Sequence, residues 1–282
     1  MTDYPLVWHP KVPTESSATG DESLRLLDMP LGSARPRREA RRVDRLSAEA
    51  RAVLEEALAT LRRHAEGAHE ASRISLRPLS PADRDAVLDL LGEGDVWGSV
   101  GGNVAYAFVE TVLTGLWRIE ATGQDGAKTE WLEVAEIPQP VLHATELMPR
   151  DAVRIPDQLP QGAMNSAALL TELQERSSGY RAGEENHVIN FTLLPITEAD
   201  AEVLTTVLGQ IPLVIRGGGY GSCRIFATGL RHVWAVQYLN SMDKVILDTL
   251  EVGGVPVAAL AAREDFEDSA GRLAEMLQAY VS

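Results

Sequence analysis

The chain contains 282 residues, 45% of them hydrophobic, and its formal net charge at pH 7 is −15. This length accommodates one large domain or two domains of ordinary size, each with its own core. The negative charge repels phosphate backbones, which argues against general nucleic-acid binding. No apolar run reaches the roughly 18 residues of a transmembrane helix, and the first residues lack the basic and apolar regions of a secretory signal. We therefore expect a cytoplasmic protein without a membrane segment.

Residues 1–46 differ in composition from the rest of the chain. They are rich in Pro, Ser, Thr, Gly and Arg and show little apolar periodicity, which predicts an irregular or disordered tail. The end of this segment carries a cluster of arginines: Arg35, Arg37, Arg38, Arg41, Arg42 and Arg45. Such a cluster is typical of a solvated tail, although docking onto an acidic partner would use the same charges.

The first regular element is predicted over residues 47–67. Ser47 is a suitable N-cap, and charged residues occupy one face of the segment that follows. Apolar side chains recur on the other face with the i, i+3, i+4 spacing of a helix: Ala50, Val53, Leu54, Ala57, Leu58 and Leu61. We therefore expect an amphipathic helix that buries its apolar stripe against a protein core.

The sequence repeats itself at an offset of 117 residues. At this offset Leu76–Asp83 aligns with Leu193–Asp200, and Trp117 aligns with Trp234. After one inserted residue, the alignment continues with Leu132-Glu133-Val134 on Leu250-Glu251-Val252, Pro138 on Pro256, and Ala144 on Ala262. Because the order of the matches is kept, gene duplication is the simplest explanation.

The repeat divides the chain into five parts. They are an irregular tail (1–46), a helix (47–67), the first copy (71–145), a linker that contains a helix (146–187), and the second copy with a C-terminal helix (188–282).

Both copies show the same local pattern. A short apolar strand, expected over Ile74–Arg77 or Val188–Leu194, precedes a helix capped by Ser80 or Thr197. This helix has an acidic residue at the N3 position and a glycine at its C-terminal end. Three or four strands follow, and the clearest hairpins join 117–121 to 129–134 and 233–239 to 245–252. Because hairpins produce antiparallel sheets, we predict an α+β fold. It is a tandem duplication of a β-α-β-β-β(-β) unit, preceded by one amphipathic helix.

The glycine-rich run Gly217–Gly221 does not fit a phosphate-binding loop. Ser222 stands where a dinucleotide fingerprint needs glycine, no lysine follows, and Cys223–Thr228 alternates like a strand rather than opening a helix. We therefore interpret this run as a turn, a bulge or a loop that a partner contacts.

Cys223 is the only cysteine, so no disulfide can form within one chain. If 229–231 forms the turn, Cys223 pairs with Gln237 and lies too far from His232 for a nucleophile and base, which need hydrogen-bond contact. The six histidines show no metal-ligand spacing. We therefore predict no catalytic, cofactor-binding or metal-binding residue and no cofactor.

Three segments carry a resemblance to a known family. They are Gly219-Tyr220-Gly221-Ser222-Cys223-Arg224-Ile225, then Arg231–Ser241, then Ile246–Val252, and they resemble the hydrogenase expression/formation proteins of the HupH/HyaF type. His187-Val188-Ile189-Asn190 adds to the match. The resemblance covers residues 71–280. It implies a cytoplasmic, non-catalytic accessory or scaffold protein for the maturation of an uptake [NiFe] hydrogenase. The implied partners are a hydrogenase structural subunit, other accessory proteins, or both.

The predicted contact surface for such a partner is the loop and hairpin around 218–232. Its candidate residues are Tyr220, Arg224, Arg231, His232 and Trp234. Trp234 and its counterpart Trp117 also fit a role as core anchors.

Two other functions stay open at this point. The protein could carry a metal or cluster to the hydrogenase through Cys223 and histidines of two chains in a homodimer. It could also bind a small molecule between the two copies as an enzyme does.

Overall fold

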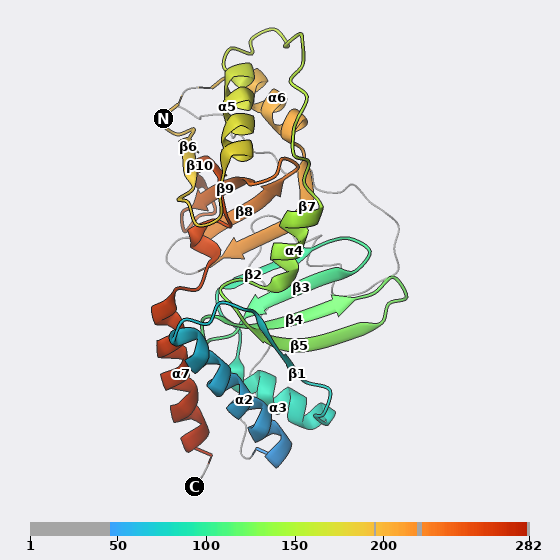
Figure 1. Ribbon diagram of the computed structural model, residues 1–282, viewed down its shortest axis with the longest axis vertical. Helices are drawn as coiled ribbons and strands as arrows, with labels where there is room; N and C mark the ends of the chain where they lie inside the picture. Colours follow the sequence, from blue (N-terminus) through green and yellow to red (C-terminus); the bar gives the residue numbers. More distant parts are fainter. Residues whose placement is uncertain (1–45, 195, 219–221, 281–282) are drawn as a thin grey trace. The chain divides into compact units, whose positions relative to one another are not determined.

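The structure is a computed structural model that describes residues 46–194, 196–218 and 222–280. The predicted tail (1–46), with its arginine cluster, lies outside the described residues except for its last position. The chain divides into two compact units (Figure 1). The first unit contains the described residues up to Leu142 together with those from Leu260 onward, and the second contains His143–Ala259.

The first unit combines helices with an antiparallel sheet whose strand order is β1-β5-β4-β3-β2. Its elements are α2 (Ala48–Ala65), β1 (Ser72–Ser75), α3 (Pro81–Leu91), β2 (Val96–Val100), β3 (Ala105–Glu110), β4 (Leu116–Thr122), β5 (Lys128–Val134) and α7 (Arg263–Gln278). Helix α4 (Gln139–Leu147) spans the boundary between the two units in sequence.

The core of the first unit lies between α2, α3, α7 and one face of the sheet. Leu54 and Leu61 of α2 pack in one buried cluster with Leu132 of the sheet and Phe266 and Leu273 of α7. The sequence pattern predicted α2 to within two residues at either end, and Ser47 caps it by accepting a hydrogen bond from the Ala50 N–H. The C-terminal helix, which the sequence pattern grouped with the second copy, contributes its apolar face to this first core.

The second unit also combines helices with an antiparallel sheet, whose strand order is β7-β8-β9-β10-β6. Its elements are α5 (Ser166–Gly179), β6 (His187–Asn190), α6 (Glu198–Leu208), β7 (Gln210–Gly217), β8 (Ser222–Thr228), β9 (Val233–Leu239), β10 (Val245–Val252) and the 3-10 turn η1 (Val257–Ala259).

The two units repeat one plan: helix, strand, helix, then four strands. In each unit the strand before the capped helix pairs with the last strand of the sheet, β1 with β5 and β6 with β10. Gly92 and Gly209, which end α3 and α6, have nearly equal φ angles of 58° and 62°. The α+β class with antiparallel sheets is confirmed. Helix α5, within the predicted linker, is the counterpart of α2.

The β8–β9 register corrects one expectation. Cys223 lies opposite Tyr238, and Gln237 lies opposite Arg224. The connection contains four residues (229–232) instead of three, because His232 adopts a left-handed conformation with a φ angle of 59° before β9 begins. Since side chains alternate across a sheet, this shift of one residue moves Cys223 away from the face that Gln237 occupies.

No helix in the described part of the chain has the length and apolar character that a membrane crossing requires.

Candidate protein-interaction surface

The predicted contact residues lie in different environments. Tyr220 lies outside the described residues, Arg231 and His232 lie in the β8–β9 connection, and Arg224 and Trp234 lie within strands. The four described residues therefore do not form a single patch.

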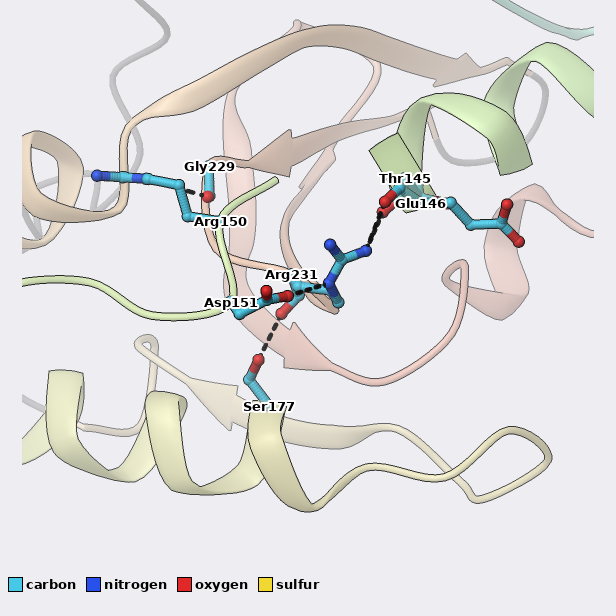
Figure 2. Close-up of polar contacts among 7 residues, drawn as sticks. All are labelled: Thr145, Glu146, Arg150, Asp151, Ser177, Gly229 and Arg231. Atoms are coloured by element: carbon cyan, nitrogen blue, oxygen red, sulfur yellow. Dashed lines mark hydrogen bonds and ion pairs between the residues drawn. The ribbon is translucent and has the colours of Figure 1, made fainter. Parts of the chain in front are cut away.

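Arg231 is held by hydrogen bonds within the second unit, as Figure 2 shows. Its Nε donates to Asp151 Oδ1 at 2.6 Å, and its Nη1 donates to the Glu146 carbonyl at the end of α4 at 2.7 Å. Its own carbonyl accepts a hydrogen bond of 2.7 Å from the Ser177 hydroxyl of α5. These bonds attach the β8–β9 connection to two helices, so Arg231 has a structural role.

Arg150 secures the same connection from a second side (Figure 2). Its N–H donates to the Gly229 carbonyl at 2.8 Å, and its carbonyl accepts from the Arg231 N–H at 2.9 Å. Its guanidinium donates to the Val207 and Leu208 carbonyls at 3.1 and 2.9 Å, at the end of α6. The last carbonyls of a helix have no hydrogen-bond partner within the helix, so a cation such as the Arg150 guanidinium is favourable there.

His232 combines an uncommon backbone with a ring contact. Its imidazole lies against Tyr180, with ring centroids 4.8 Å apart and planes tilted by 55°. Burial lowers the pKa of the imidazole, the charge of Arg231 lowers it further, and Asp151 opposes both. The neutral form is therefore favoured, which suits packing against an aromatic ring.

Trp234 is a core residue with 3% of its surface exposed. It lies opposite Ala227 on one side and Glu251 on the other. Its counterpart Trp117 is fully buried and donates from Nε1 to the Ala135 carbonyl at 2.9 Å. Both tryptophans thus act as core anchors, and a partner would not reach Trp234 without local opening.

Arg224 lies directly opposite Arg216 on the neighbouring strand. Burial lowers the pKa of both guanidinium groups. The charge of Arg224 lowers that of Arg216 further, whereas Asp243 opposes the shift of Arg224. Two cations held opposite each other at the end of a sheet can bind an anionic group.

Cys223 is buried, and burial raises the pKa of its thiol. A metal-binding or nucleophilic cysteine needs the opposite shift, because the thiolate is the reactive form. The β8–β9 register places Cys223 opposite Tyr238, whereas His232 lies just before the first residue of β9. Among the described residues, no three His, Cys, Asp or Glu side chains are grouped closely enough to hold a metal ion.

Sequence reasoning missed Arg216, Arg150 and Asp151. Arg216 could have been found from the sequence only together with the strand register. The β7–β8 register places Arg216 directly opposite Arg224, so their side chains lie on the same face of the sheet. No local pattern marks Arg150 or Asp151, since their partners lie about 60 to 80 residues away in sequence.

The family described as "HupH hydrogenase expression protein, C-terminal conserved region" matches twice, over residues 47–159 and 163–280. The two matches each begin at or just before the helix that precedes the strand-helix-strand unit, in agreement with the internal repeat.

Named relatives extend this match. The hydrogenase expression/formation protein HupH of Rhodobacter capsulatus is 37% identical over 94% of both chains. HupH of Rhizobium leguminosarum bv. viciae is 43% identical over 70% of this chain and 71% of its own length. The hydrogenase-1 operon protein HyaF of Escherichia coli K12 is 34% identical over 74% and 73%.

Solved structures that match include the hydrogenase expression protein HupH from Thiobacillus denitrificans ATCC 25259. It is 26% identical, covers 42% of this chain and 97% of its own, and has a TM-score of 0.37. The double family match and the identities of the named relatives establish that the chain belongs to the HupH hydrogenase expression protein family.

Proposed function

We propose that the protein is a non-catalytic accessory protein for the maturation of a [NiFe] hydrogenase. In this proposal it acts in the cytoplasm by binding an immature structural subunit or another accessory protein. The observation that carries the proposal is the family match over both copies, together with relatives named hydrogenase expression/formation proteins.

The arrangement of the site is compatible with binding a polypeptide. Arg224 and Arg216 lie directly opposite each other near the end of the second sheet. Arg231 donates to Asp151, and the His232 ring lies against Tyr180, so both side chains have a structural role. We therefore assign the partner contact to the Arg224 end of the hairpin.

Gene deletion tests the accessory role. Cells that express the hydrogenase operon without this gene should lose most hydrogenase activity, and a plasmid copy of the gene should restore it. Activity that stays unchanged at every oxygen tension would show that the proposal is wrong.

Co-purification tests the binding step. The tagged protein, purified from cells that express the operon, should retain a hydrogenase subunit or accessory protein identified by mass spectrometry. Cells that lack the operon provide the control. Arg231→Glu is unsuitable as a binding variant, because it would break the bonds to Asp151 and Glu146 and so disturb the fold.

A further inference from the structure

The outer edge of strand β6 carries backbone groups that the second unit does not use. Among the described strands, β6 comes last in the order of this sheet and pairs with β10 alone. The Phe191 N–H, one residue beyond β6, donates at 3.0 Å to the carbonyl of Asp248, the residue opposite. Because hydrogen-bonded pairs alternate along an antiparallel ladder, Ile189 bonds to β10, and the N–H and C=O of Val188 point away from it. Neither of these Val188 groups has a partner among residues 46–194, 196–218 and 222–280.

The side chains of this edge are uncharged. Residues 186–192 read Asn-His-Val-Ile-Asn-Phe-Thr, which carries no formal charge when the histidine is neutral. The His187 ring is held within the unit by a contact of 2.8 Å with Glu172 of α5. Val188 exposes 50% of its surface, whereas its neighbour Ile189 is buried. An unpaired strand edge with an exposed apolar side chain and no charge is a template on which another strand can pair.

The first copy protects the equivalent edge. Arg73 of β1 lies opposite Glu133, and Val188 of β6 lies opposite Glu251. Since Glu133 and Glu251 are equivalent in the repeat, Arg73 and Val188 hold the same place in the two sheets. The pairing partners fix this equivalence, because the connections from β1 and β6 to the helices that follow differ in length.

Arg73 supplies the charge that β6 lacks. Its guanidinium lies over the Trp131 ring, 3.9 Å from the ring centroid. A charged side chain on an edge strand discourages the pairing of further strands. The fold therefore does not require valine at this place, and only the second copy leaves its edge unprotected by charge.

We propose that the outer edge of β6 pairs with the same edge of a second copy of the chain, in an antiparallel ladder centred on Val188. A two-fold axis at this position lets the two Val188 residues exchange two hydrogen bonds, from each N–H to the other C=O. The same axis places the two Val188 side chains next to each other on one face of the joined sheets, which removes part of their exposed surface from water.

Charge favours a second copy as the occupant. Glu184 and Glu185 precede β6 and are exposed. In a ladder centred on Val188, Glu185 lies toward Phe191 of the other copy and Glu184 toward Thr192, so no acidic side chain meets another. The chain has a net charge of −15, so two copies repel each other over most of their surface and can meet more easily at an uncharged edge. A partner selected by charge would find no charged side chain on β6 to recognise.

The test measures the association of the purified full chain by sedimentation velocity, and it does not depend on the proposed function. The unaltered chain should show a reversible equilibrium between monomer and dimer. Val188→Pro removes only the outward N–H, and proline is tolerated on an edge strand where this group faces away from the sheet. Val188→Arg introduces the first-copy residue. Each change should raise the Kd of the dimer about tenfold or more.

Two control variants separate the edge from general damage. Val188→Thr keeps the backbone groups and the β-branched shape, so it should keep the dimer. Val257→Arg alters another strongly exposed valine, which lies outside the sheet in η1, and should leave the equilibrium unchanged. Urea unfolding of the monomeric variants should resemble that of the unaltered monomer, since the outward Val188 groups have no partner within the described chain.

Cross-linking locates the contact. A short bis-maleimide should link Val188→Cys into a dimer but should not link Val257→Cys. The natural Cys223 is buried and is present in both variants. A cross-link that forms at position 257 and not at 188 would place the contact elsewhere and overturn the proposal.

The remaining outcomes decide between a second copy and another occupant. A chain that stays monomeric at every concentration would overturn the proposal, as would a dimer that both Val188→Pro and Val188→Arg leave intact. If the chain is monomeric and Val188→Arg instead abolishes co-purification of a hydrogenase protein, that partner occupies the edge, and the proposal is likewise wrong.

Discussion

His232 of the second unit has the backbone conformation that Gly115 has in the first. Their φ angles are 59° and 82°, and the two positions are 117 residues apart. The Gly115 carbonyl accepts a hydrogen bond from the Ala135 N–H at 3.0 Å, and the His232 carbonyl accepts from the Gly253 N–H at 2.8 Å. The connection between the second and third strands of each unit's four-strand run therefore requires a left-handed residue, whatever its side chain.

Replacing His232 tests this requirement. A side chain in the left-handed region is strained, and glycine is not. His232→Ala keeps the strain and loses the contact with Tyr180, whereas His232→Gly loses the contact but relieves the strain. We expect the alanine variant to be less stable than the glycine variant by about 1 kcal/mol in urea unfolding. The reverse order would contradict the assigned backbone conformation.

A matched pair of serines ties this connection to a helix in each unit. Ser177 of α5 donates to the Arg231 carbonyl at 2.7 Å, and Ser269 of α7 donates to the Thr114 carbonyl at 2.9 Å. Positions 114 and 231 are equivalent in the repeat, although α5 and α7 are not. Each serine-to-alanine change should lower the free energy of unfolding by about 1 kcal/mol.

Combining the two serine changes provides the control. The serines share no hydrogen-bond partner, so the double variant should lose the sum of the two single losses in denaturant unfolding. A loss much smaller than that sum would show that the two bonds are not independent.

Asp200 connects the starts of two helices. Its Oδ1 accepts from the N–H groups of Met164, Asn165 and Ser166 at the start of α5, and its Oδ2 accepts from the Thr197 N–H before α6. Burial opposes ionisation, but these hydrogen bonds prevail and lower the pKa to about 2. Asp200→Asn places an amide donor among these donors and should cost about 2–4 kcal/mol.

The first copy provides the control for Asp200. Its counterpart Asp83 is hydrogen-bonded by the side chains of Ser80 and Ser47, which lower the pKa of its carboxyl. Because these are side-chain bonds rather than bonds from the backbone N–H groups that start a helix, Asp83→Asn should change stability less. The Asp200 contribution is present above the ordinary pKa of 3.8 and is lost as the pH falls toward 2. Equal effects of the two changes would contradict the assigned role.

Glu110 should make the stability of the fold fall with rising pH, which is opposite to the effect of Asp200. Burial raises the pKa of this carboxyl from 4.5 to about 7, against a hydrogen bond from the Gly115 N–H. The unfolded chain therefore releases its proton at lower pH than the folded chain, and stability falls as the pH rises from 4.5 to 7. This loss is on the order of 3 kcal/mol.

Glu110→Gln removes the titration while its amide oxygen can still accept the Gly115 hydrogen bond. Denaturant unfolding of the variant and the unaltered chain should give similar stability near pH 4 and favour the variant near pH 8. A stability difference that does not change with pH would show that Glu110 ionises normally.

Several elements were predictable because their signals are local. Helix α2 follows from its apolar stripe and the Ser47 cap, and α6 follows from Thr197 and Gly209. The β9–β10 hairpin, with bounds 233–239 and 245–252, agrees with the structure at every end. The β8–β9 register was wrong by one residue, because loop length depends on the left-handed conformation of His232, which no sequence pattern marks.

The expected strand at the start of the second copy also ends early. Strand β6 stops at Asn190, where the side-chain oxygen accepts from the Thr192 N–H and turns the chain. As a result Leu193 becomes exposed, although its counterpart Leu76 is buried. Two apolar residues at equivalent positions of the repeat thus lie in different environments, although the sequence pattern around them is the same.

The amino-acid order alone specifies the repeat, the fold class and the family. Capping residues and apolar periodicity are properties of neighbouring positions, and the 117-residue offset is found by aligning the sequence with itself. The placement of Arg216 beside Arg224, the clamp around Arg231 and the packing of α7 against α2 depend on long-range pairing. Strand register and helix docking join residues far apart in sequence, and a change of one residue in a loop reverses which side chains share a face.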